Sequence, residues 1–192
     1  QKQEIDQKAN ELVLKANELS VVNRVTNALA SYGSLDEIIH LVGDQMKELF
    51  KANIVYLALL DKKTNTINFP YQYGDNMPSQ NLGEGLTSKI LGNGKPLLIN
   101  KDIEEMTAKL GASRLGIPSA SYLGVPIFRG KEAIGVLSVQ STEKENRFNE
   151  SDSNLLSTIA SSVGVAINKA QLFEEVVASK KSAEQANEAK SA

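Results

Sequence analysis

The sequence predicts an α+β domain, in which an antiparallel sheet is flanked by helices and a long helix lies at each end of the chain. Two pairs of apolar, β-branched segments, within residues 54–73 and 121–140, are each joined by a short polar turn and predict two hairpins. Apolar residues spaced by three and four mark both the first thirty residues and residues 156–177. This spacing is typical of long helices with one apolar seam.

The N-terminal helix carries apolar residues at heptad spacing. Ile5, Leu12 and Leu19 recur every seven residues, and Asn23 falls on the same line. A polar residue in such a seam can fix the register of a dimer, although a surface asparagine can also fall there by chance. Gly33 and Ser34 end this helix, and Ser34 with Glu37 predicts a capping box for a second helix over 35–50.

The segment between the two hairpins is long and partly ordered. It predicts a short helix near 84–91, a strand over 96–99 and a short helix near 104–110. A connection of this length is usually functional. The acids Asp102, Glu104 and Glu105 are explained by the start of the third of these elements, where the helix dipole favours negative charge.

The C-terminal helix predicts a second seam, which includes Val163, Ala170, Phe173 and Val177. Two copies in parallel would align both seams, and we expect a parallel homodimer. The alternative is that both long helices merely cover the sheet. The two arrangements are compatible, since the half of each helix nearest the domain can cover the sheet while the outer half pairs with a second copy.

Three groups of residues resemble motifs of the GAF domain family. Residues 83–91 with 94–99 look like its Gly-x-Gly helix start and Gly-x-Pro strand entry, residues 121–139 are similar to its central hairpin, and Phe148 with Asp152 matches its closing helix. The resemblance implies a GAF/PAS-like antiparallel sheet of five or six strands. It predicts an N-terminal signalling helix over 1–20, the GAF domain over 21–177 and a linker helix over 178–192.

The resemblance also implies a ligand pocket between the sheet and the middle segment. Phe69, Tyr71 and Tyr73 alternate along one predicted strand and should share a face. The remaining pocket candidates are Thr87, Ser88, Met106 and Ser121. The alternative is that the aromatic rings simply fill the core, as such stripes usually do.

No cofactor is predicted. The chain contains no cysteine, which argues against a bilin, and its single histidine, His40, has no second imidazole or thiolate with which to hold a metal. Relatives that bind cyclic nucleotides carry an Asn-Lys pair before Phe-x-x-x-Asp-Glu. Here Phe148 and Asp152 are present, but Ser153 replaces the glutamate and no Asn-Lys pair precedes them, so a cyclic nucleotide is unsupported.

The composition of the chain disfavours some kinds of binding partner. A formal net charge of −2, with basic residues scattered among acids, disfavours nucleic acid, and no apolar stretch is long enough to cross a membrane. The first residue is Gln1, and both ends are typical of a piece of a larger cytoplasmic signalling protein. The order Ala186-Asn187-Glu188-Ala189-Lys190-Ser191 resembles the helix that enters the phosphoacceptor helix of sensor histidine kinases, which implies a downstream kinase in the same chain.

Three hypotheses follow. The first is a dimeric sensory module, not itself an enzyme, that relays a small-molecule or upstream signal to a kinase. The second is a dimerisation and spacer module without a ligand. The third is an enzyme such as the methionine sulfoxide reductases built on this fold, which use cysteine and are therefore disfavoured by its absence.

Overall fold

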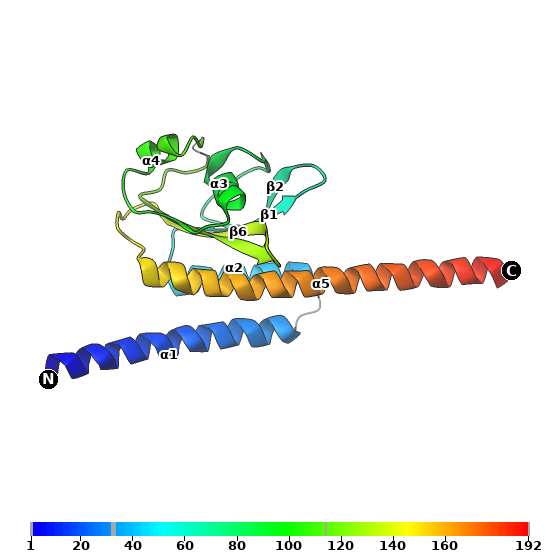
Figure 1. The fold of residues 1–192 in the computed structure, drawn as a ribbon, viewed down its shortest axis with the longest axis horizontal. Helices are drawn as coiled ribbons and strands as arrows, with labels where there is room; N and C mark the ends of the chain where they lie inside the picture. The colour runs from blue at the N-terminus through cyan, green and yellow to red at the C-terminus, as the bar shows by residue number, and fades with distance from the viewer. Residues whose placement is uncertain (1, 32–33, 114, 192) are drawn as a thin grey trace.

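The computed structural model describes residues 2–31, 34–113 and 115–191. Within them it contains five helices and six strands, and their arrangement confirms the predicted α+β class (Figure 1). The elements in chain order are α1 (Lys2–Ser31), α2 (Leu35–Phe50), β1 (Ile54–Asp61), β2 (Thr66–Tyr73), β3 (Gln80–Asn81), α3 (Gly85–Asn93), β4 (Leu97–Ile99), α4 (Ile103–Lys109), β5 (Ser121–Arg129), β6 (Glu132–Ser141) and α5 (Glu150–Ser191).

The strands form one sheet in the order β3-β2-β1-β6-β5-β4, and every neighbouring pair is antiparallel. Both predicted hairpins are present, and they join side by side through β1 and β6. In the second hairpin the strands extend until only Gly130 and Lys131 connect them, and Gly130 supplies the positive φ that this tight turn requires. The two-residue strand β3 was not predicted, because it is too short to show any alternation.

Helices α2 and α5 cover one face of the sheet (Figure 1). Their buried residues join the inward side chains of β1, β5 and β6 in one core, which includes Val42 and Met46 from α2 and Val163 and Ile167 from α5. Helix α1 contacts both α2 and α5 on the side away from the sheet. The sheet is therefore anchored to α5 along the N-terminal half of that helix.

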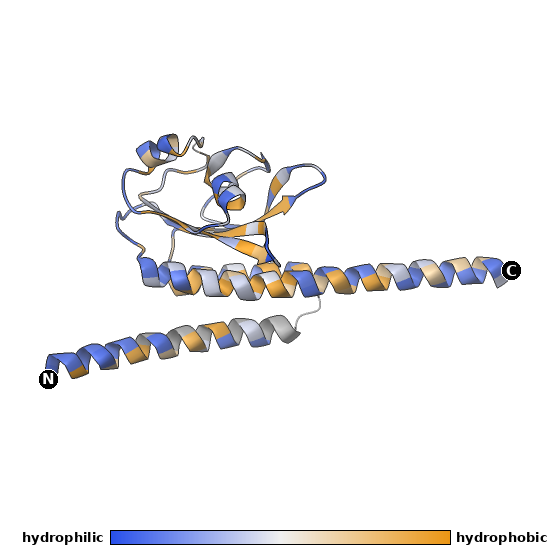
Figure 2. Cartoon of the chain, in the orientation of Figure 1, coloured by the Kyte–Doolittle hydropathy of each residue, from blue (hydrophilic) through white to orange (hydrophobic). Residues whose placement is uncertain are grey.

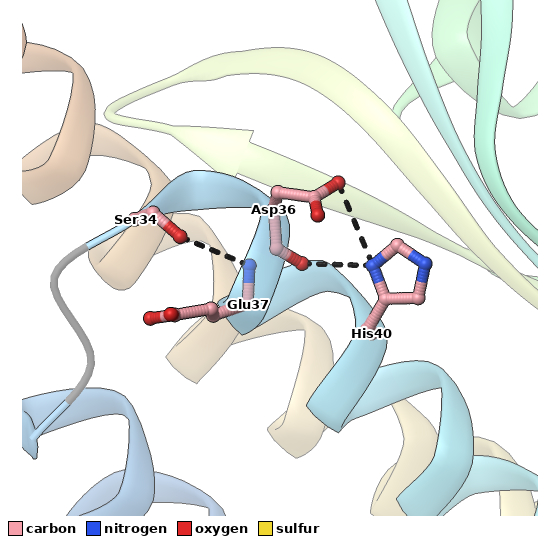
Figure 3. Close-up of polar contacts among 4 residues, drawn as sticks. All are labelled: Ser34, Asp36, Glu37 and His40. Atoms are coloured by element: carbon pink, nitrogen blue, oxygen red, sulfur yellow. Dashed lines mark hydrogen bonds and ion pairs between the residues drawn. The ribbon is translucent and has the colours of Figure 1, made fainter.

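The N-cap half of the predicted capping box forms, but the described contacts do not include the reciprocal bond between the Glu37 side chain and the backbone N–H of Ser34. Ser34 accepts a hydrogen bond from the backbone N–H of Glu37 at 3.3 Å, as Figure 3 shows, whereas Gly33 lies outside the described residues. His40 lies one turn further along, with its Nδ1 3.0 Å from the backbone oxygen of Asp36. This local contact at an exposed helix surface agrees with a structural role for the histidine.

The other face of the sheet carries α3, α4 and the loops around them (Figure 1). A second and smaller core lies here, in which Ile90 of α3 and Ile99 of β4 pack on the sheet residues Tyr56, Ile67 and Tyr122. Each strand of the middle of the sheet thus has one face toward the long helices and the other toward the middle segment.

A β-bulge in β2 corrects the prediction that three aromatic residues share a face. Leu57 pairs with Tyr71, whereas Leu59 pairs with Asn68, so β2 contains one extra residue at this point. Phe69 therefore faces the middle segment, where its ring packs edge-on against Tyr56 with centroids 5.3 Å apart. Tyr71 faces α2 and its hydroxyl donates to Asp44 at 2.8 Å.

Tyr73 also lies on the α2 side, with the ammonium group of Lys47 4.3 Å above its ring centre. The extra residue reverses the alternation along β2, because side chains on a strand change face at every position. Tyr71 and Tyr73 therefore belong to the helical side of the sheet and not to a pocket on the other face.

The seam residues of α5 divide into two groups. Val163 and Ala170 are buried in the core of their own chain, which differs from the predicted dimer seam because this half of α5 lies against the sheet. Phe173 and Val177 are 63% and 49% exposed, beyond the end of the sheet. Every residue from 172 to 191 is exposed, and Figure 2 shows apolar colour concentrated on the strands and the nearer half of α5.

Candidate functional site

A cavity of about 620 Å³ lies between the sheet and the middle segment. Its floor comes from β1, β5 and β6, and its walls come from α3, α4 and the loop that precedes β5. The lining residues that the structure describes are Tyr56, Met77, Gln80, Gly85, Leu86, Thr87, Asp102, Ile103, Glu104, Glu105, Thr107, Ala108, Ser113, Leu115, Ile117, Pro118, Ser119, Ala120, Tyr122, Gln140 and Glu145. This size is in the range of pockets that hold small organic ligands.

Three hydroxyl groups meet at the floor of the cavity. The phenol oxygen of Tyr56 on β1 lies 2.9 Å from Oγ1 of Thr87 on α3 and 2.8 Å from the phenol oxygen of Tyr122 on β5. Burial raises the pKa of Tyr56, against the opposing effect of its hydrogen bonds, and burial beside Tyr56 raises the pKa of Tyr122 well above its usual value. Both phenols therefore stay neutral and offer hydrogen bonds without charge.

Thr107 of α4 adds a polar group that the protein does not satisfy. The residue is 3% exposed and lines the cavity, and its Oγ1 has no hydrogen-bond partner among the described residues. A buried hydroxyl without a partner costs about 1–3 kcal/mol. This oxygen has almost no accessible surface, so it lies enclosed behind the cavity wall and does not face the cavity.

Among the described residues that line the cavity, the charged side chains are all acidic. The described lining includes the acids Asp102, Glu104, Glu105 and Glu145, all exposed, and no lysine, arginine or histidine. Lys109 neutralises one of them through an ion pair with Glu105 at 2.6 Å. The buried side chains of the described lining are therefore neutral, and its charged side chains are exposed.

The structure brings one of the predicted pocket residues, Thr87, to the cavity wall. Phe69 lies behind Tyr56, and Ser88 is buried, where its hydroxyl accepts from the backbone N–H of Gly83. Met106 is 39% exposed on α4 and is not part of the lining.

Ser121 is fully buried, but its hydroxyl bonds to the backbone of the loop before α5 and does not line the cavity. Its Oγ donates to the backbone oxygen of Lys144 at 2.7 Å and accepts from the backbone N–H of Arg147 at 3.2 Å.

The sequence-based prediction of the pocket missed five lining residues, Tyr56, Gln80, Thr107, Tyr122 and Gln140. Tyr56 and Tyr122 had a signal, since each is a phenol in an otherwise apolar strand.

A hydrogen-bonded clasp connects the cavity wall to the start of α5. Asn100 follows β4, and its side chain donates to the backbone oxygen of Phe148 at 2.6 Å and accepts from the N–H of Phe148 at 3.3 Å. The backbone oxygen of Asn100 also accepts from Asn146 at 2.7 Å. The strand that leads into α4 is thus tied to the residue two positions before α5.

Within the described part of the chain, no three histidine, aspartate or glutamate side chains gather in a way that could hold a metal ion. No described helix is long and apolar enough to cross a bilayer.

An antiparallel sheet with a cavity on one face and helices α2 and α5 on the other is an α+β architecture that leaves room for a small ligand. The chain belongs to the GAF domain family, whose sequence model matches residues 33–168. This match lies within the predicted range of 21–177.

Solved structures share the fold at low sequence identity. The GAF domain of an Acinetobacter phosphoenolpyruvate-protein phosphotransferase is 22% identical, with a TM-score of 0.71 over 80% of this chain and 94% of that one. A free methionine-R-sulfoxide reductase from Neisseria meningitidis, in complex with its substrate, is 19% identical, with a TM-score of 0.71 over 82% of this chain and 92% of that one.

The curated relatives are longer proteins. The formate hydrogenlyase transcriptional activator of Salmonella typhimurium is 24% identical over 162 residues, which cover 79% of this chain and 23% of the relative. The chain thus spans less than a quarter of the length of the curated relatives that it matches.

Proposed function

We propose that this chain is a regulatory sensor module in which a small molecule binds in the cavity and changes the position of α5, which relays the signal to an output domain. The observation that carries the proposal is a sizeable cavity whose floor is formed in part by the neutral hydroxyl-bearing side chains of Tyr56, Thr87 and Tyr122. Family membership supports a regulatory role.

The sheet offers a short path from the cavity to α5. Tyr122 faces the cavity, whereas the next residue, Leu123, faces the core that α5 shares. A ligand that moves Tyr122 moves the same strand on which α5 packs. Interfaces packed this closely shift between discrete arrangements rather than deforming smoothly.

The Asn100 clasp offers a second path. Closure of α4 on a ligand would pull on Asn100 and, through its two side-chain hydrogen bonds, on Phe148. Both paths end on α5, so occupancy of the cavity can bias the position of this helix.

Native mass spectrometry of the gently purified protein tests the sensor. Retained extra mass that matches a small molecule would support it. Protein without extra mass, and without any binding by small-molecule probes, would favour the alternative of a spacer without a ligand.

We include a parallel homodimer in the proposal, with its contact formed by the exposed ends of the long helices. Ile5, Leu12 and Leu19 on α1 are each at least 66% exposed. A second, separate exposed apolar surface on α5 consists of Leu172, Phe173, Val176 and Val177, and the C-terminal end of this helix lies opposite to the N-terminus of α1 (Figure 1). Asn23 is also exposed on α1. Separate exposed apolar patches on two neighbouring helices support burial against a second copy.

Sedimentation equilibrium at low micromolar concentration tests the dimer. Leu12→Lys and Val177→Lys should each shift the mass toward the monomer, because each places a charge in the contact. Gln7→Lys, which places the same charge on the opposite side of α1, is the control. A wild-type monomer at the same concentration would reject this part of the proposal.

For the output domain we propose a histidine kinase in the same chain, on the basis of the C-terminal resemblance at residues 186–191. The transcriptional activator among the relatives supports a different output, direct control of transcription. Autophosphorylation of the natural full-length protein with labelled ATP distinguishes them, since a kinase yields an acid-labile phosphohistidine and an activator yields none. A methionine sulfoxide reductase is not proposed, because the chain has no cysteine thiol.

A further inference from the structure

We propose that the cavity binds a neutral molecule that carries a carboxamide or lactam group, and that Gln80 recognises this group. The inference rests on the proposed sensor function and names the ligand class of the same site. It is carried by two features that lie next to each other, a buried glutamine whose amide group is not satisfied and the uncapped start of α3.

Gln80 is a buried polar side chain without a conventional hydrogen-bond partner. The residue lines the cavity and is only 8% exposed. Among the described residues its one contact runs from Nε2 to the sulfur of Met77 at 3.8 Å, and a thioether is a weak acceptor. Its Oε1 has no described partner and, unlike Oγ1 of Thr107, is not fully enclosed. Gln140, the other buried glutamine of the described lining, differs because its Oε1 accepts from the hydroxyl of Ser119.

The start of α3 supplies hydrogen-bond donors beside this oxygen. Oε1 of Gln80 lies 3.5 Å from the position that a Cβ atom on Gly85 would occupy. Glu84, the N-cap of α3, makes no side-chain bond to the helix, and the described contacts give no partner to the backbone N–H groups of Gly85 and Leu86. Both residues line the cavity. The corner formed by Gln80, Gly85 and Leu86 therefore offers a free acceptor next to free donors.

A carboxamide complements this corner. It carries a donor and an acceptor side by side, so its N–H can donate to Oε1 of Gln80 while its carbonyl oxygen accepts from Nε2 or from the start of α3. Gln72 pairs in this way with the backbone of Met77, since its Oε1 accepts from the N–H at 2.6 Å and its Nε2 donates to the carbonyl at 3.0 Å. A ketone has no N–H to donate, and a carboxylate would place a second acceptor against Oε1.

Apolar side chains near the corner set the rest of the ligand. Met77, Leu86 and Leu115 line the cavity, and Cδ1 of Leu115 lies 3.0 Å from the Cβ position of Gly85. A ring that carries the amide group would bury apolar surface against these side chains. We therefore expect a ligand with an apolar ring and one amide.

The experiment titrates the isotope-labelled protein with two matched probe series. It follows the NMR signal of the side-chain NH2 group of Gln80 and the backbone amides of Gly85 and Leu86. One series is benzamide, acetophenone and benzoate, and the other is 2-piperidone, cyclohexanone and N-methyl-2-piperidone. Benzamide and 2-piperidone should each bind about threefold to tenfold more tightly than the other members of their series, the effect of one neutral hydrogen bond.

Gln80→Met keeps the length of the side chain and removes its amide group. It should abolish the preference for benzamide over acetophenone without lowering the stability of the free protein, because the long contact with Met77 is the only described one that it loses. Loss of the NH2 signal in this variant also assigns that signal. Gln171→Met is the matched control, because this glutamine lies on α5 across the sheet from the cavity and accepts from Arg129 (Figure 1). It should change neither the affinity nor the preference.

The outcomes separate the two proposals. If acetophenone or benzoate binds as tightly as benzamide, or if the preference for amides persists in Gln80→Met, the ligand class is wrong while the sensor function stands. If no probe of either series shifts the backbone amides that line the cavity, both the ligand class and the sensor function are wrong.

Discussion

Gly164 lies where helix α5 closely approaches strand β5. A Cβ atom at this position would collide with the backbone oxygen of Phe128 on β5. Backbone atoms cannot turn aside as a flexible side chain can, so any larger residue must push the helix away from the strand. The glycine thus sets the distance over which the proposed relay acts.

Gly164→Ala should destabilise the protein by about 1–3 kcal/mol, despite the higher helix propensity of alanine, because overpacking outweighs that gain. Gly92→Ala on α3 is the matched control, since nothing lies within 4 Å of its added Cβ, and it should be neutral or stabilising by up to about 1 kcal/mol. Urea unfolding measures the free energy of unfolding of both variants. Equal stability of the two variants would show that α5 does not rest on β5 through Gly164.

The buried phenols predict a loss of stability in alkali. Burial raises the pKa of Tyr56 and of Tyr122 above the unfolded value of about 10. Above that pH the unfolded state loses protons that the folded state keeps, so the free energy of unfolding falls as pH rises, whereas below it the contribution is complete.

Tyr122→Phe should therefore show a shallower decline in unfolding free energy between pH 9 and about pH 11 than the wild type. Urea unfolding at a series of pH values checks this. A variant whose decline matches that of the wild type would contradict the assignment of Tyr122 as a phenol kept neutral by burial.

Residue patterns predicted some features of the site and missed others for a physical reason. Thr87 could be assigned to the cavity from its place after the Gly-x-Gly turn. Tyr71 could not be placed correctly, because the bulge opposite Ala58 changes which face each residue of β2 occupies, and the sequence carries no visible sign of the extra residue.

At the scale of elements, the Asn100 clasp connects β4 to the beginning of α5. Asn100→Ala removes two hydrogen bonds to the backbone of Phe148, which is 2% exposed, and should cost about 1–3 kcal/mol because a buried N–H and carbonyl lose their partner. Hydrogen exchange should also increase in the first turns of α5 and not in α2.

Asn93→Ala is the matched control for the clasp. The side chain of Asn93 accepts only from the N–H of Lys95 in an exposed turn, so its loss should cost less than about 1 kcal/mol and leave α5 unchanged. If Asn100→Ala were as mild as Asn93→Ala, the connection between the cavity wall and α5 would not depend on this side chain.

The elements themselves were largely predictable. Local signals were enough for α2, where Ser34 caps the helix and apolar residues follow at helical spacing, and for both hairpins. A heptad pattern, however, predicts an apolar helix face without indicating which surface that face contacts. Val163 and Phe173 share one pattern, yet only Val163 reaches the sheet, because the sheet ends before Phe173.

At the scale of the whole molecule, the cavity depends on tertiary assembly. Its floor comes from strands at residues 54–61 and 121–141, and its walls come from segments between residues 77 and 120. No local pattern indicates that Thr107 and Tyr56 line the same cavity, since they are 51 positions apart in the sequence and are brought together only by the fold. The residues that line the cavity could therefore be identified only from the structure.

The exposed half of α5 should show hydrogen exchange that depends on protein concentration. Residues 172–191 are exposed throughout, and a solvated helix of this length is only marginally stable in water. If two copies pair through Leu172 and Val176, which are 53% and 65% exposed, pairing should protect the amides of this half and leave those around Val163 unaffected, because the latter are held by the sheet. Hydrogen exchange measured at low and high protein concentration separates the two halves, with Val176→Lys expected to abolish the concentration dependence. Equal exchange at every concentration would mean that this half of α5 does not pair with a second copy.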